Sequence, residues 1–113
     1  MELDIEMIKA CRMTALSCRQ CVSVISVEEP IVGVYLRSFK QCEDICFAFL
    51  QAAADNSVYL GKIAFLCIGL LEECAEIAEY KNDKIFLQTA SSCRDFSGRL
   101  TQLLSLEKIG VTI

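Results

Sequence analysis

The sequence predicts an all-α protein, an antiparallel up-down-up-down four-helix bundle. Three observations support this fold class. Apolar residues recur at alternating three- and four-residue spacing along most of the 113 residues, which is typical of bundle helices. Short breaks rich in turn-forming residues divide this pattern into four segments. No segment shows the two-residue alternation of a strand. We expect a single domain over residues 1–113, because a chain of this length supports one hydrophobic core.

The first predicted helix ends near Ile25. Ser26 and Glu29 have the spacing of a capping box, and Pro30, the only proline, is tolerated in a first helical turn. We therefore expect the second helix to begin around Ser26 to Pro30. The inward-facing stripe of the first helix is Leu3, Met7, Cys11, Thr14, Cys18, Cys21 and Ile25.

The second predicted helix ends at Asp55-Asn56-Ser57, where Asn56 or Ser57 can cap the third helix. Its stripe is Val32, Tyr35, Phe39, Cys42, Cys46, Phe49 and Ala53.

The third predicted helix ends at Lys81-Asn82-Asp83, and Gly110 is expected to end the fourth, leaving residues 111–113 as a tail. The stripe of the third helix is Leu60, Ala64, Cys67, Leu71, Cys74 and Ala78. The stripe of the fourth helix is Phe86, Ala90, Cys93, Ser97, Leu100 and Leu104.

The amino-acid composition argues against several classes of function. Hydrophobic residues make up 54% of the chain, yet no apolar run approaches the roughly 20 residues that cross a bilayer. The most apolar run, 63–71, lies between Lys62 and Glu72. The acidic amino terminus does not resemble a secretory signal, so we expect a cytoplasmic protein without a membrane partner. A net charge of −4 argues against a nucleic-acid partner, because such proteins collect phosphates with basic residues.

The eight cysteines and the absence of histidine are the unusual features. Every cysteine falls on the inward-facing stripe of its helix. Burial alone is no sign of function, because a free cysteine behaves as a small hydrophobe. In a reducing compartment, however, so many thiols favour metal binding or redox chemistry over disulfides. The lack of histidine excludes His-dependent zinc sites, Cys-His catalysis and the Glu-x-x-His di-iron site. We therefore predict that the protein is not an enzyme.

Folding the helices at the predicted turns gives each cysteine a height along the bundle. Cys11, Cys46 and Cys67 should share one level, and Cys42 and Cys93 the next. Cys18 should face Cys74 at the level beyond, with Cys21 further toward the first turn. Cys42 and Cys46 are one helical turn apart, so both sulfur atoms face the same way.

This arrangement predicts the metal. Thiolates are soft ligands that favour Cu(I), zinc or iron–sulfur clusters. Tetrahedral zinc and cubane clusters need four thiolates, and no predicted level holds four. Cu(I) is satisfied by two or three thiolates, so the Cys42-x-x-x-Cys46 pair is a sufficient site. We predict Cu(I) as the bound metal, with more than one ion.

Two runs of sequence resemble the cysteine-rich four-helix-bundle copper storage proteins of bacteria. These runs are Gln41-Cys42-Glu43-Asp44-Ile45-Cys46 and Cys67-Ile68-Gly69-Leu70-Leu71-Glu72-Glu73-Cys74-Ala75-Glu76. Cys18-Arg19-Gln20-Cys21 and Ser92-Cys93-Arg94-Asp95 also fall where that family places cysteines.

The resemblance implies that cysteines on all four helices bind many Cu(I) ions inside the bundle. It also implies a homo-oligomer, a dimer or a tetramer. All eight cysteines become candidate metal ligands, with the motif pair first and the Cys18–Cys21 pair next. The candidates are Cys42, Cys46, Cys18, Cys21, Cys67, Cys74, Cys11 and Cys93.

The chain also departs from the family pattern, because members typically carry more cysteines and often have histidines near one end. Positions where further thiols could stand are occupied by Phe49, Leu70, Ile77 and Ala78. This is the pattern of a cysteine-depleted member. An alternative therefore stays open: a structural or protein-interaction bundle whose cysteines fill the core and whose metal capacity is lost. Its interface would be formed by Ile8, Val22, Leu36, Ile45, Leu50 and Ile68.

Overall fold

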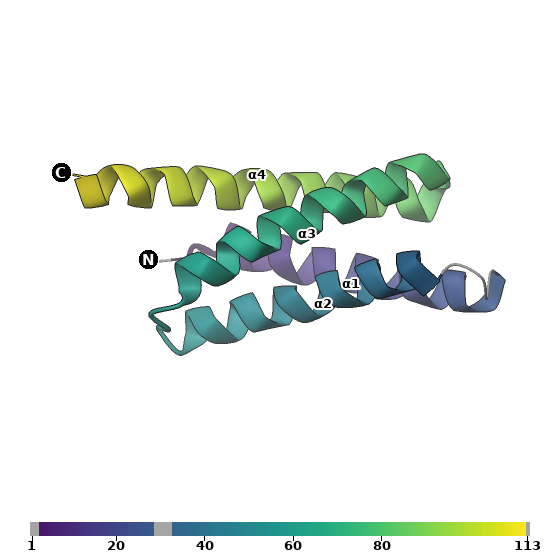
Figure 1. The fold of residues 1–113 in the computed structure, drawn as a ribbon, viewed down its shortest axis with the longest axis horizontal. Coiled ribbons are helices and arrows are strands. Elements are labelled where there is room, and N and C mark those ends of the chain that lie inside the picture. Colours follow the sequence, from purple (N-terminus) through teal and green to yellow (C-terminus); the bar gives the residue numbers. More distant parts are fainter. Residues whose placement is uncertain (1–2, 29–32, 113) are drawn as a thin grey trace.

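The computed structural model describes residues 3–28 and 33–112, which form four antiparallel helices in an elongated bundle (Figure 1). The helices are α1 (Ile5–Glu28), α2 (Gly33–Ala54), α3 (Leu60–Lys81) and α4 (Lys84–Thr112). The bundle measures 51 × 23 × 23 Å along its principal axes. The predicted fold class is confirmed.

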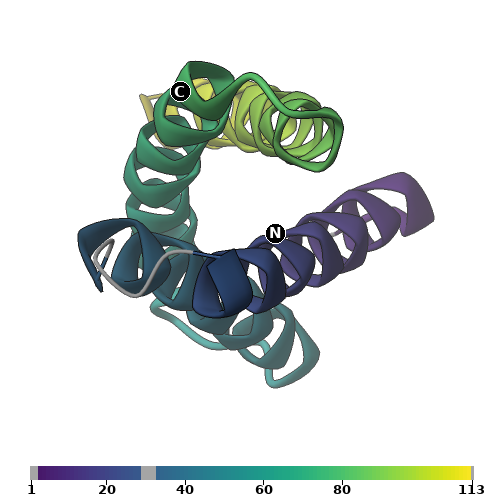
Figure 2. The same cartoon turned by 90° about the vertical axis from the view of Figure 1, so that its right-hand side faces the viewer.

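Each helix packs against the helix next to it in sequence, and α4 closes the bundle against α1. Viewed toward one end, the four helices surround a common interior (Figure 2). In the part of the chain that the structure describes, α1 makes no close approach to α3, nor α2 to α4. Side chains of diagonal helices can therefore meet only along the central axis. The inward-facing cysteines of all four helices point toward this axis.

The start of α1 and the first break differ from the sequence prediction. Asp4, which was not predicted as a cap, accepts a hydrogen bond from the Met7 amide through Oδ1 at 2.8 Å. Ser26 lies within α1, which continues to Glu28, so the predicted helix start at Ser26 is wrong. The other two residues of that prediction, 29 and 30, lie outside the described residues. Helix geometry is disfavoured only at the residue before a proline, and nothing before that position interrupts α1.

The second and third breaks lie where the sequence predicts them, and both depend on an asparagine with left-handed backbone. Asn56 (φ 52°) ends α2 and Asn82 (φ 54°) ends α3. After α2, the Ser57 amide donates to Ala52 O at 2.9 Å and the Asn56 amide donates to Ala53 O at 3.3 Å. This is the Schellman pattern, for which asparagine is suited.

The predicted cap of α3 is wrong. Tyr59 precedes the helix and caps it without a side-chain hydrogen bond, while the Ser57 hydroxyl accepts a bond from the Tyr59 amide at 3.1 Å. The predicted end of α4 is also wrong, because the helix continues through Gly110 to Thr112. A single glycine costs a helix only about 1 kcal/mol relative to alanine, which is not enough to end it.

The core is formed largely by the predicted stripes, with Ala15, Ala75 and Phe96 also buried in it, while the predicted Val32 lies outside the described residues. Four phenylalanines on α2 and α4 are buried in it and pack as two pairs. Phe39 and Phe86 meet with ring centroids 5.9 Å apart and tilted rings, and Phe49 and Phe96 stack at 5.7 Å. In α2 and α4 alike, one member precedes the central cysteine, Cys42 or Cys93, and the other follows it. The two aromatic pairs therefore lie on opposite sides of these cysteines along the bundle axis.

The apolar residues proposed for an alternative interface pack mostly against this core. Those found partly buried against it are Val22, Leu36, Ile45, Leu50 and Ile68. The positions where further thiols could stand are likewise filled by packed side chains, with Phe49 and Ala78 buried and Leu70 and Ile77 partly buried.

Candidate metal centre

All eight cysteines are buried and free of disulfides. Their exposed fractions are 0% or 1%. The prediction that every cysteine lies on the inner face of its helix is therefore correct. Their surroundings differ, however, and divide them into a cluster of four, a group of three and a single thiol.

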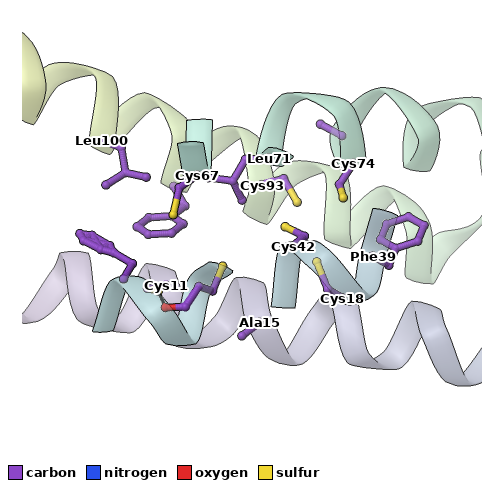
Figure 3. Close-up of a cluster of buried hydrophobic side chains, with 14 of the residues drawn as sticks. Cys11, Ala15, Cys18, Phe39, Cys42, Cys67, Leu71, Cys74, Cys93 and Leu100 are labelled. Atoms are coloured by element: carbon purple, nitrogen blue, oxygen red, sulfur yellow. Dashed lines mark hydrogen bonds between the residues drawn. The ribbon is translucent and has the colours of Figure 1, made fainter. Parts of the chain in front are cut away.

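Four cysteines, one from each helix, form what we call the four-thiol cluster: Cys18 (α1), Cys42 (α2), Cys74 (α3) and Cys93 (α4). The Sγ atoms of Cys18, Cys42 and Cys93 all lie within 4.8 Å of one another. The Cys74 thiol donates to Ser38 O at 3.2 Å, and its sulfur atom is not among those that lie mutually within 4.8 Å. Figure 3 shows the four sulfur atoms converging on the bundle axis.

The predicted heights of these four cysteines along the bundle are wrong. Cys42 and Cys93 were predicted on one level and Cys18 and Cys74 on the next, so that no level held four thiols. Side chains on a helix tilt toward its amino terminus. Because neighbouring helices are antiparallel, their side chains tilt in opposite directions along the bundle axis. Cys18 and Cys74 therefore tilt toward the level of Cys42 and Cys93, and Cys42 and Cys93 tilt toward the level of Cys18 and Cys74. Two adjacent levels thus merge into one group of four sulfur atoms.

Cys11, Cys46 and Cys67 form a second set, the three-thiol group, in agreement with their predicted common level. The Cys11 thiol donates to Cys46 O at 3.2 Å, and the Cys67 thiol donates to Ile45 O at 3.6 Å. Cys46 lies one helical turn from Cys42 on the same face of α2. Cys46 therefore connects this group to the four-thiol cluster.

Cys21 belongs to neither set. Its Sγ atom lies 3.1 Å from the Thr89 hydroxyl. That hydroxyl also contacts two backbone carbonyls, Ile85 O at 3.0 Å and Ser17 O at 3.3 Å. Either atom can donate in the Cys21–Thr89 pair, and the hydroxyl proton has the two carbonyls as alternative acceptors. The sequence offers one clue to this contact, since Thr89 lies four residues before Cys93 on the same inward face of α4.

Hydrogen bonding among the thiols sets their acidity. Bonds from Cys18, Cys46, Cys74 and Cys93 lower the pKa of Cys42, although burial acts against them. The pKa of Cys18 is raised by its hydrogen bonds to Cys42, Cys74 and Cys93 and by burial. When the cluster loses its first proton, the charge therefore settles on Cys42, where neighbouring S–H groups can point toward it.

The remaining thiols hold their protons more firmly. Burial, followed by the charges of Cys11 and Cys42, raises the pKa of Cys67 to about 12. Burial also raises the pKa of Cys21, with the Thr89 bond acting in the opposite direction. Hydrogen bonding to Cys18 favours the thiolates of Cys74 and Cys93, but bonds to Cys42 and burial outweigh it and raise both pKa values.

The arginines adjacent to two of these cysteines point away from them. Arg19 pairs with Glu43 of α2 at 2.5 Å, and Arg94 pairs with Glu72 and Glu79 of α3. Arginine can activate a cysteine only when it faces the sulfur. These arginines instead join helices at the bundle surface.

The site thus presents sulfur ligands in a dry interior, a donor set that selects soft metal ions. The family model described as Csp, copper storage protein, matches residues 2–105. The chain belongs to the copper storage protein family. Comparison with curated proteins and with solved structures gives no match.

Membership of the copper storage protein family confirms the resemblance read from the sequence. Together with the buried cysteine cluster, it indicates copper binding. The family's role is storage rather than catalysis, so the protein is not an enzyme. Among the described residues, no helix combines the length and the hydropathy needed to span a membrane.

Proposed function

We propose that this protein binds and stores Cu(I) in the bundle core, with cysteine thiolates as the ligands. The main support is the convergence of Cys18, Cys42 and Cys93, whose sulfur atoms lie within 4.8 Å of one another in a fully buried setting. Two or three thiolates satisfy Cu(I), so this trio is sufficient for a first ion. Soft sulfur ligands favour Cu(I) over the hard divalent cations of the cell.

Storage requires only that the ion be held away from water and from other ligands. The two phenylalanine pairs lie on either side of the trio along the bundle axis, and the described cysteines are closed to solvent. Thiols must lose their protons to bind the ion, so loading releases protons and its affinity rises with pH. Because Cys42 has the lowered pKa, we propose its thiolate as the first ligand to form.

The same proposal covers further ions. Cys46 lies between the four-thiol cluster and Cys11, whose thiol donates to the Cys46 carbonyl, so a second ion can be held one helical turn from the first. We propose all eight cysteines as the pool of ligands, with Cys21 the last to be used because its thiol already has a hydroxyl partner.

We also propose that the protein acts in the cytoplasm as a homo-oligomer, a dimer or a tetramer. Free thiols in this number persist in a reducing compartment. The outer surface near the start of α3 carries apolar side chains that suit a contact between copies, namely Val58, Tyr59, Phe65 and Leu66. Light scattering coupled to size exclusion would test the assembly, and a monomer at all concentrations would contradict it.

The test of copper storage is an anaerobic titration of fully reduced protein with Cu(I) against a competing chelator. We expect more than one tightly held equivalent. The double variant C42S/C46S removes the motif pair and should lose most of this capacity, while C21S, which changes a buried cysteine outside both sets, should keep the first equivalents. Circular dichroism establishes that each variant is folded. Less than one tightly held equivalent in the wild type would refute the proposal and leave a bundle whose cysteines only fill volume.

A further inference from the structure

The four-thiol cluster holds more ligands than Cu(I) requires. It gathers one sulfur atom from each of the four helices, and all four residues are fully buried. Three of the sulfur atoms lie mutually within 4.8 Å, and the fourth, from Cys74, points toward them from α3 (Figure 3). Linear or trigonal coordination of one Cu(I) ion uses only two or three of these four thiols.

We propose that the four-thiol cluster also forms a tetrahedral site for one Zn²⁺ ion, with Cys18, Cys42, Cys74 and Cys93 as its ligands. This inference goes beyond copper storage, since it assigns a second kind of metal ion to this chain. It rests on the arrangement of these four side chains and does not require that Cu(I) binds.

The distances suit such a site. Zinc–sulfur bonds of about 2.3 Å place tetrahedral sulfur ligands about 3.8 Å apart. The spacing of Cys18, Cys42 and Cys93 is at most 4.8 Å, so each sulfur atom needs to move by less than about 1 Å to reach that separation. Shifts of this size need only small side-chain rotations.

Cys74 is the ligand that must change its partner. Its thiol now donates to Ser38 O, and a thiolate has no proton to donate. Deprotonation therefore releases the sulfur atom from this carbonyl, and the side chain already points toward the other three thiols (Figure 3). Because Cys74 lies outside the set of sulfur atoms that are mutually within 4.8 Å, its rotation is the larger movement that completes the tetrahedron.

The balance of the binding step is simple. One Zn²⁺ ion displaces four thiol protons to solvent, and the resulting centre carries a net charge of −2. Buried charge needs hydrogen-bond donors. Cys46 lies outside the ligand set and one helical turn from Cys42 on the same face of α2, so its thiol can keep its proton and donate to this thiolate. Such partners of metal ligands support the metal site.

The rest of the core cannot form a second site of this kind. The three-thiol group has one sulfur atom too few, because α4 contributes Phe96 and Leu100 beyond Cys93 rather than a fourth cysteine. Cys21 is bonded to the Thr89 hydroxyl instead of to a sulfur atom. The inference therefore predicts a stoichiometry of one zinc ion per chain.

Cobalt(II) is the spectroscopic probe for this site, because tetrahedral cobalt thiolates have visible bands that octahedral cobalt lacks. We titrate reduced, metal-free protein with Co²⁺ under anaerobic conditions. The expected result is a tetrahedral spectrum that saturates at one equivalent and disappears when one equivalent of Zn²⁺ is added. A parallel measurement in weak buffer should show release of close to four protons per zinc ion near neutral pH.

The variants C18S and C21S form a matched pair, since both remove a fully buried thiol from α1. C18S and C74S should lose the tetrahedral cobalt spectrum and weaken zinc binding by at least about tenfold, while C21S should keep both. Unfolding by urea shows whether each variant is folded. Because C74S changes α3 alone, it gives an independent result if C18S does not fold.

Several outcomes would overturn the inference. These are an octahedral spectrum, saturation at a value other than one, or equal behaviour of C18S and C21S. A Cu(I) titration of the same preparation separates the two proposals. Cu(I) binding without a tetrahedral cobalt spectrum rejects the zinc site alone, and the reverse result rejects copper storage alone.

Discussion

The four-thiol cluster and the three-thiol group contain the same residue type at the same depth, yet their hydrogen bonds differ. In the cluster, the sulfur atoms of Cys18, Cys42 and Cys93 lie within 4.8 Å of one another, and Cys74 donates to Ser38 O. In the group, Cys11 and Cys67 donate to backbone carbonyls of α2. A thiol bonded to a carbonyl has a fixed partner that a metal ion must displace, whereas thiols bonded to one another already face a common point. Burial alone therefore does not distinguish a ligand from a core residue.

The number of helices involved explains the difference. Every helix contributes a sulfur atom to the four-thiol cluster, and three of these sulfur atoms meet within 4.8 Å of one another. At the level of the three-thiol group, α4 contributes Phe96, which stacks on Phe49. The aromatic pair occupies the interior there, and the nearby thiols turn toward carbonyls instead.

The largest effect expected from this comparison is on the first Cu(I) ion. C42S removes a thiol whose sulfur atom lies within 4.8 Å of those of Cys18 and Cys93, and we expect it to weaken binding of the first equivalent by at least about tenfold, which corresponds to about 1.4 kcal/mol. C67S removes an equally buried thiol from the three-thiol group and should weaken that step much less. Competition with a Cu(I) chelator measures both variants. Equal losses in the two would remove the distinction between the two sets.

A smaller effect is expected on the alkaline stability of the metal-free protein. The fold raises the pKa of Cys67 from 9.0 to about 12, so it favours the neutral thiol. This contribution is fully present below pH 9 and is lost as the pH rises toward 12, with a slope of up to about 1.4 kcal/mol per pH unit.

Urea unfolding of reduced wild type and C67A at several pH values tests this contribution. The wild type should lose more stability than C67A as the pH rises from about 9 to about 11. Parallel curves for the two proteins would show that the Cys67 thiol is not held neutral by the fold.

The smallest effect on stability and on Cu(I) binding is expected from substitution of Cys21, which lies outside both sets. C21A removes one thiol–hydroxyl hydrogen bond, while Thr89 keeps its bond to Ile85 O. We expect a loss of about 1 kcal/mol in the free energy of unfolding and no change in the number of Cu(I) ions bound tightly at first. Chemical denaturation and the chelator titration measure the two quantities. A loss of the first Cu(I) equivalent in C21A would place Cys21 among the primary ligands.

The sequence was sufficient for the fold and for the inward direction of every cysteine, because both follow from the spacing of apolar residues along a helix. It was also sufficient for the breaks at Asn56 and Asn82, where one residue type favours the left-handed backbone. It did not predict that Ser26 and Gly110 lie within helices. A capping residue or a glycine ends a helix only when the residues after it also adopt a non-helical backbone conformation.

The composition of the site was predicted only in part. Levels counted along straight helices separated Cys18 and Cys74 from Cys42 and Cys93, because such a count ignores the direction in which side chains tilt. The Cys21–Thr89 contact was also missed, since it depends on how closely α1 approaches α4. The division into a cluster, a group and a single thiol therefore needed coordinates. The assignment of all eight cysteines as ligands, and of the chain as one domain, stays a prediction.

The phenylalanine pairs have a consequence for the speed of exchange. Phe39 with Phe86, and Phe49 with Phe96, lie across the axis on both sides of the central cysteines. An ion moving along that axis must wait until a ring pair parts, and openings of this kind are local fluctuations of a packed core. The rates of metal uptake and release should then be limited by local opening of the helices rather than by the concentration of the ion. The packing of the core would therefore set how fast the ion exchanges.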